Sequence, residues 1–218
     1  MQRDPIVWTG LAILAMVAFA HGCAPIYTAY TNPEFKRYES AHSKIALLPF
    51  DVTLEPNFTT NRDRRDRMEA QHESMISKMV WDGLSWYQKR NSYTVEIQSL
   101  DERDRLFIQA IGRRPSHKLL TTLTTSDVCK ILKADALIVG NMTLSRPFHI
   151  EPTHLSRLMS FGKFDRASIN MSVHECGENK LLWNYKHAAK VVQHNTPRDA
   201  AELAIGRAML EFPYKHIQ

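Results

Sequence analysis

An uncharged apolar run near the N-terminus divides this chain into two unlike parts. The run covers about fifteen residues, Ile6–Ala20, and small residues follow it directly before Cys23. It is shorter than the roughly 20 apolar residues that a membrane-spanning helix needs. Its length, the upstream Arg3 and the small-residue ending are typical of a cleaved export signal. We therefore predict a signal peptide over residues 1–22 and a water-soluble part after it.

The residues around Cys23 resemble the lipobox of bacterial lipoproteins. In such proteins the chain is cleaved before a cysteine, here between Gly22 and Cys23, and that cysteine then carries lipid. The resemblance implies a diacylglycerol on Cys23, and two or more acyl chains anchor a protein stably. Neither Ala24 nor Pro25 is acidic, so the inner-membrane retention signal of many Gram-negative lipoproteins is missing. The expected location is the outer membrane, with the protein lipid-anchored and facing the periplasm.

Two departures from the lipobox pattern leave an alternative open. Ala20 stands where leucine is commoner, and His21 is unusual beside a cleavage site. In the alternative, the apolar run is an uncleaved anchor helix and Cys23 is incidental.

The composition after the signal is that of one globular domain. The chain is 44% hydrophobic and 23% charged, which is typical of folded proteins. Its net charge of +5 mildly favours anionic partners, and nucleic acid is not expected for an exported chain. Cys129 and Cys176 remain after lipidation and could pair in an oxidising compartment. The sequence does not bring them within bonding distance, so two separate thiols are favoured.

The segment after Cys23 predicts a tether. Residues 24–43 lack a helical or strand period and contain Pro25 and Pro33. We predict a flexible tether over residues 23–43, docked at most through a few aromatic side chains, and a single periplasmic domain over residues 44–218. Some twenty extended residues reach about 65 Å at roughly 3.3 Å each, so the domain would stand well off the membrane.

Hydrophobic periodicity predicts an α/β order of elements in that domain. Apolar runs predict strands at residues 44–50, 93–97 and 136–144, and clean alternation predicts a hairpin of residues 166–174 and 181–192. Helical spacing and capping residues predict helices at residues 64–89, 101–111, 124–132 and 197–210. Residues 51–61, 113–123 and 145–163 are expected to be loops. The implied architecture is α/β, a mixed sheet of about five strands with helices packed on it.

This order of elements resembles a superfamily of outer-membrane lipoproteins. The superfamily includes the curli secretion channel subunit and the lipoprotein activator of a peptidoglycan synthase (CsgG/LpoB-like). The matching features are the lipobox, the strand at 44–50 with the long helix after it, the strand at 134–143, the turn and strand from Gly177 to Trp183, and a final helix. The resemblance implies an anticodon-binding-like α/β domain and an accessory role toward an envelope machine, such as a peptidoglycan synthase.

The sequence carries no motif of a hydrolase, a metalloprotease or a phosphate-binding loop. His174 and Cys176 come nearest to a pair of metal ligands, but zinc sites usually show tighter paired spacings. We therefore expect no enzyme activity, no cofactor and no metal.

Two basic segments are the candidate partner contacts. They contain Arg62, Arg64, Arg65, Arg67, Arg113, Arg114 and Lys118. Such charges are most often ordinary solvated surface, and the functional interpretation is a contact for an acidic protein or an anionic glycan such as peptidoglycan. The leading expectation is a non-enzymatic, lipid-anchored protein that binds or regulates an envelope machine. The alternative is a ring-forming assembly component of an outer-membrane secretion or export system.

Overall fold

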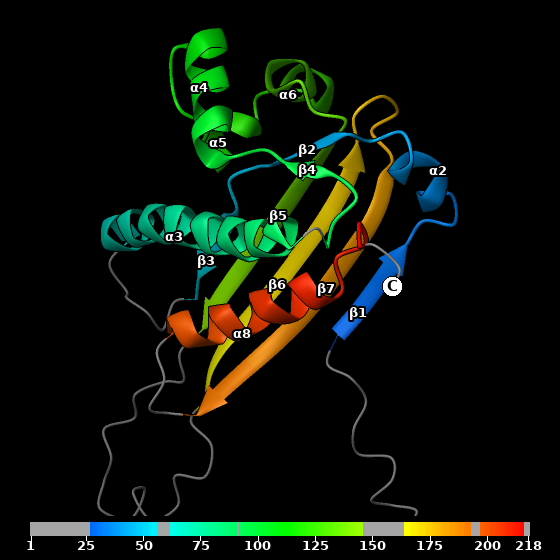
Figure 1. Ribbon diagram of the computed structural model, residues 1–218. Helices are drawn as coiled ribbons and strands as arrows, with labels where there is room; N and C mark the ends of the chain where they lie inside the picture. The colour runs from blue at the N-terminus through cyan, green and yellow to red at the C-terminus, as the bar shows by residue number, and fades with distance from the viewer. Residues whose placement is uncertain (1–26, 56–61, 91, 146–163, 193–196, 216–218) are drawn as a thin grey trace, which may run out of the picture.

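A mixed β-sheet with helices packed on both faces forms the domain (Figure 1). The structure is a computed structural model, and it describes residues 27–55, 62–90, 92–145, 164–192 and 197–215. The α/β class predicted from the sequence is confirmed, with a seven-stranded sheet in the described residues where about five strands were expected.

The sheet combines antiparallel and parallel pairs. Its strands are β1 (Tyr27–Thr31), β2 (Lys44–Leu47), β3 (Asp51–Leu54), β4 (Glu96–Ile97), β5 (Ala136–Ser145), β6 (Phe164–Glu175) and β7 (Leu181–Val192). Their order is β1-β7-β6-β5-β2-β4, and β3 also pairs with β5. The β1–β7, β7–β6 and β6–β5 pairs are antiparallel. The pairs of β2 and β3 with β5, and of β2 with β4, are parallel.

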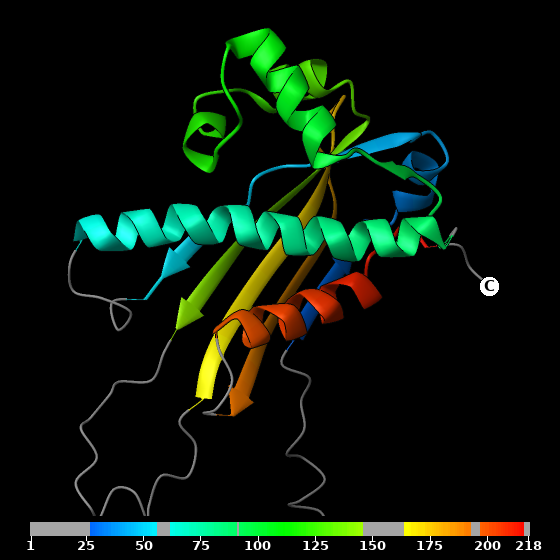
Figure 2. The ribbon, with the colours of Figure 1, turned by 60° about the vertical axis from the view of Figure 1, so that its left-hand side comes forward.

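Two helices cover one face of the sheet and a smaller helical group covers part of the other. The helices are α2 (Phe35–Glu39), α3 (Arg62–Lys89), α4 (Leu100–Ile111), α5 (His117–Leu120), α6 (Thr125–Leu132) and α8 (Pro197–Leu210). α3 and α8 lie across the first face, and α4, α5 and α6 gather at one end of the molecule (Figure 2). The side chains of β2 project alternately to the two faces of the sheet, so β2 contributes to both hydrophobic cores. Ile45 and Leu47 are buried in the core on the α3–α8 side, and Ala46 is buried in the core on the α4–α6 side.

Capping residues mark the end of α4 and the start of α6 where the sequence predicts them. Gly112 follows α4 with φ +81°, a left-handed conformation that glycine adopts without a steric penalty. The Thr124 hydroxyl accepts a hydrogen bond from the Asp127 backbone N–H at the start of α6 (3.1 Å). The predicted loop at residues 113–123 contains the short helix α5, which four residues are too few to reveal by periodicity.

β2 and β3 lie end to end along one edge of β5, with Pro49 between them. β2 pairs with the start of β5, and β3 pairs with Asn141–Leu144. Proline has no N–H to donate, so the ladder of β2 ends there, as the sequence predicts. The loop expected from Asp51 onward was wrong, because four residues give too short an alternation to recognise β3.

The flexible tether predicted over residues 23–43 is wrong from Tyr27 onward. β1 pairs with β7 from Tyr27↔His187 to Thr31↔Trp183, and Phe35 of α2 is buried in the main core. The partner strand lies more than 150 residues away in the sequence, which local patterns do not reveal. The folded part therefore begins at Tyr27 instead of Lys44.

A disulfide bond joins Cys129 of α6 to Cys176 at the end of β6. The expectation of two separate thiols was therefore wrong. The fold places the two Cα atoms 5.9 Å apart, within the range that disulfides need. The bond ties the α4–α6 group to the β6–β7 hairpin.

Candidate binding surface

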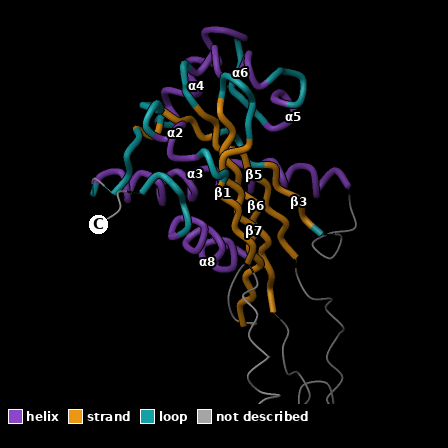
Figure 3. The backbone as a smooth tube through the Cα atoms, turned by 90° about the vertical axis from the view of Figure 1, so that its right-hand side faces the viewer, coloured by secondary structure: helices purple, strands orange, loops and turns teal. Residues whose placement is uncertain are grey.

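Part of the sheet has no helical cover on one side. α3 and α8 pack on the side formed by buried residues such as Ala167, Met171 and Tyr185. In the edge-on view, α8 lies on one side of the lower half of the sheet, and no described helix lies on the other (Figure 3). The uncovered side carries the alternate residues of the strands β3, β5, β6, β7 and β1.

Polar residues form a row across this uncovered side. The register pairs Asp51 with Asn141, Asn141 with Asn170, Asn170 with Lys186 and Lys186 with Thr28. Paired residues of neighbouring strands project from the same side of a sheet, so the row continues over five strands. We call the surface formed by this row together with Thr143, Ser168 and Asn184 the open face.

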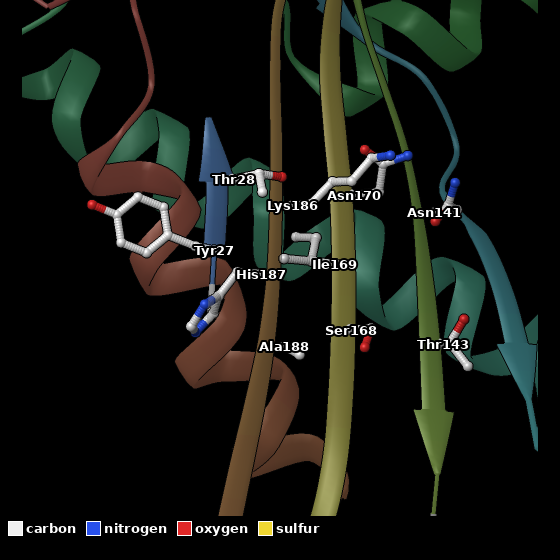
Figure 4. Close-up of a pocket in the computed structure, with 10 residues that line it drawn as sticks. All are labelled: Tyr27, Thr28, Asn141, Thr143, Ser168, Ile169, Asn170, Lys186, His187 and Ala188. Atoms are coloured by element: carbon white, nitrogen blue, oxygen red, sulfur yellow. The ribbon is translucent and has the colours of Figure 1, made fainter. Parts of the chain in front are cut away.

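The open face contains a shallow hollow of about 360 Å³, shown with its lining residues in Figure 4. Asn184 Nδ2 donates to Asn170 Oδ1 at 2.7 Å, which fixes the orientation of the Asn170 amide. Asn141, Ser168 and Lys186 are exposed, and Lys186 forms no ion pair within the described part of the chain. The open face therefore offers amides, hydroxyls and the Lys186 cation, while the Asp51 carboxylate at its far end lies 3.7 Å from His117 Nε2 of α5. The part of the face around Lys186 suits a polar partner with negative charge.

A second cavity of about 410 Å³ lies between α5, α6 and the sheet. Its walls are mainly leucine and valine side chains, and His117 and His174 are its two histidines. His174 Nε2 lies 3.1 Å from Ser172 Oγ, and burial lowers the pKa of His174, which keeps the ring neutral near pH 7. Within the described residues no carboxylate is hydrogen-bonded to His174. This serine–histidine pair thus lacks the third group that orients a catalytic base.

The structure places the basic residues that the sequence singles out on two neighbouring helical regions. Arg62, Arg64 and Arg67 are exposed on the first turns of α3, and Arg65 is half-buried there. The sequence predicts a helix from residue 64, and α3 begins two residues earlier, at Arg62. Its charges lie along one helix.

The second basic group lies around α4 and α5. Arg113 and Arg114 are exposed after α4, with Arg114 Nε 3.9 Å from Asp104 Oδ2. Lys118 is exposed on α5. α5 contacts α3 where the backbone N–H of His117 donates a hydrogen bond to Glu73 Oε1 (3.1 Å). That contact lies eleven residues beyond Arg62 and six beyond Arg67, about 16 Å and 9 Å along the helix. The two groups thus come from two neighbouring parts of the fold, α3 and the α4–α5 region.

The proposed lipidation site lies outside the described residues, as do Gly22 and the rest of the apolar N-terminal run. Lipidation of Cys23 therefore stays a prediction. Among the described helices, none has the length and apolar character to cross a membrane. The same residues contain no group of three or more histidine, cysteine and acidic side chains that could hold a metal ion.

No protein-family model matches the chain, and no curated protein sequence matches it. Similar solved structures include lipoprotein GNA1162 from Neisseria meningitidis, with 10% identity, a TM-score of 0.45, and coverage of 78% of this chain and 96% of that chain. The PelC dodecamer from Paraburkholderia phytofirmans has 9% identity and a TM-score of 0.44, with 84% of this chain and 95% of that chain covered. The LpoB C-terminal domain from Salmonella enterica has 9% identity and a TM-score of 0.37, with 72% of this chain and 96% of that chain covered.

These structures include a member of the group that the sequence resembles, the LpoB C-terminal domain. Identities of 9% and 10% leave function open. The functional proposal therefore depends on the residues of this chain.

The open face was not identified as a site from the sequence, although one of its signals was present. The alternation in β6 predicts that Ser168 and Asn170 project away from the core, and both are on the uncovered side. What the sequence did not reveal is the register, which aligns these residues with Asn141 and Lys186 on neighbouring strands.

Proposed function

We propose that this chain is a non-enzymatic lipoprotein, anchored through Cys23 to the outer membrane, whose periplasmic domain binds an envelope protein through the open face. The observation that carries the proposal is the continuous polar row from Asn141 to Thr28 that no described helix covers. Asp51 continues this row in register but lies beside α5, 3.7 Å from His117 Nε2. By the sequence resemblance, a peptidoglycan synthase is one candidate partner, and this part of the proposal is an analogy.

The chemistry of the open face favours an acidic protein surface. Lys186 is exposed next to the Thr28 end of the row and lacks an ion-pair partner in the described residues, so a carboxylate of the partner would pair with it. Asn141 and Asn170 can each donate and accept hydrogen bonds, which matches the exposed backbone and side-chain amides of a protein. Complementary charge of this kind mainly sets specificity and the rate of association.

Photo-crosslinking in intact cells tests the proposal. A benzophenone amino acid replaces Ser168 on the open face or Glu202 on α8, both of which are exposed. We expect a crosslinked envelope protein from position 168 and none from position 202. Equal adducts from both positions, or an adduct that contains glycan and no protein, would contradict the proposed partner.

Charge reversal at Lys186 provides a second measure of the same interaction. We expect K186E to lower the crosslinking yield at position 168 about fivefold, because one interfacial charge contributes about 1 kcal/mol. The matched control is K89E, which reverses an exposed lysine at the end of α3 on the covered side of the sheet. A yield that K186E leaves unchanged, or that both variants lower equally, would count against recognition by the open face.

A second copy of the chain is the alternative partner, because the outer edge of β1 is not paired within the described residues. All five residues of β1 are exposed, and an exposed edge strand can pair with another chain. This arrangement would suit a ring-forming assembly component of a secretion or export system. Sedimentation of the mature domain separates the two functions, since a sharp monomer at all concentrations excludes the ring.

A further inference from the structure

The distance between the proposed lipid anchor and the folded domain is short. β1 begins at Tyr27, four residues after Cys23. Four residues span at most about 14 Å even when fully extended. The N-terminal end of β1 therefore cannot lie farther than this from a lipidated Cys23.

The sheet extends beyond the start of β1 toward the same end of the molecule. Tyr27 pairs with His187, and β7 continues for five more residues to Val192, which pairs with Phe164 at the start of β6. Five strand residues advance by about 17 Å. β1 runs away from this end, antiparallel to β7, as Figure 1 shows at the bottom of the sheet. The strands thus project as far past Tyr27 as the anchor segment can reach.

We infer that the end of the sheet formed by the start of β6 and the end of β7 rests on the headgroup layer of the membrane that holds Cys23. The inference depends on the proposed function only for the lipid on Cys23. If the sheet stands upright on the membrane, its end extends about 17 Å past Tyr27. This is roughly 3 Å more than the ~14 Å that the segment between Cys23 and Tyr27 can span. Contact with the headgroups or a tilt of the sheet follows, and both hold the domain against the lipid surface.

The residues at this end suit a lipid surface. Arg166 is exposed near the start of β6 and forms no ion pair in the described part of the chain. A cation of this kind is attracted to headgroup phosphates. Tyr27 is 43% exposed, and tyrosine is favoured at the boundary between lipid and water. The open face then begins just above the membrane, so its partner must approach close to the same membrane.

Fluorescence quenching tests this placement on the full-length, lipidated protein. The protein is reconstituted into vesicles of phosphatidylethanolamine and phosphatidylglycerol (3:1) that carry a headgroup spin label. A fluorophore is attached to S168C, near the proposed contact, or to E178C, in the turn at the opposite end of the same two strands; both native residues are exposed. Ser168 and Glu175 alone are separated by about 23 Å along β6. We expect at least threefold stronger quenching at position 168 than at position 178.

Intact mass measured on the same sample separates the two ways of failing. If Cys23 is not acylated, the proposed anchor is wrong. If Cys23 is acylated and both labels show the same weak quenching, the anchor holds and the membrane contact is wrong.

Lengthening the segment between Cys23 and β1 provides the matched control. Inserting twenty glycine and serine residues after Ala24 gives a flexible segment with a root-mean-square span of about 27 Å. We expect this insertion to reduce the quenching at position 168 to the value at position 178. Unchanged quenching at position 168 would overturn the inference, because the short anchor segment would then not be what places the domain.

Discussion

Replacing Gly140 with alanine is expected to destabilise the domain by about 3 kcal/mol, the upper end of the usual range for overpacking a core. Gly140 lies in the middle of β5, and a Cβ atom there would be 2.3 Å from Phe50 Cζ. The Phe50 ring is fully buried, and its backbone N–H donates to Ser77 Oγ of α3 at 3.1 Å. Because this bond and the surrounding core hold Phe50 in place, the ring cannot move away cheaply. Urea unfolding followed by circular dichroism measures the loss.

Two further variants make this prediction specific. G206A is the matched control, since a Cβ atom at Gly206 in α8 would meet open space, and alanine there should stabilise the helix by up to about 1 kcal/mol. Replacing the Phe50 ring with the smaller leucine side chain in F50L/G140A should recover part of the stability that G140A loses. An unfolding midpoint for G140A equal to that of the unaltered protein would show that Phe50 does not pack on Gly140.

Removing the disulfide is expected to cost about 2–4 kcal/mol of stability. Cys129 and Cys176 are 47 residues apart in the sequence, and closing a loop of that size corresponds to about 4 kcal/mol in the chain-entropy account. The measurement compares urea unfolding of the protein with that of C129A/C176A, each with and without reducing agent.

Reduction should destabilise the unaltered protein and leave the double variant unchanged. The reason is that the bond constrains the unfolded chain and also ties α6 to the hairpin. Finding two reactive thiols per molecule besides Cys23 in the native, non-reduced protein would contradict the bond.

The parts of the fold that the sequence predicted are those with long local patterns. Helical spacing of apolar residues over residues 64–89 predicted α3, and alternation over residues 166–174 predicted β6. The end of α4 followed from Gly112, because only a residue tolerant of φ +81° fits there easily. The residues that form these elements are close together in the sequence, or they alternate because one face of the element is buried. Both patterns can be recognised without knowing the rest of the fold.

The parts that were missed depend on distant partners. β1 is exposed at all five residues and is held by pairing with β7, so no apolar stripe marks it. The disulfide needed the placement of α6 beside the β6–β7 turn, which no spacing encodes. The open face likewise required the register of five strands, although the polar residues of β6 were correctly predicted to face away from the core.

The membrane anchor is the claim on which the proposed function and the inferred membrane contact both depend. Mass spectrometry of the protein extracted from membranes tests it most directly, together with metabolic labelling by a palmitate analogue. We predict an N-terminal peptide that begins at Cys23 with a diacylglycerol on its sulfur, and labelling that C23S abolishes while C129A retains it. A polypeptide that begins at Met1 and carries an unmodified Cys23 would contradict the account.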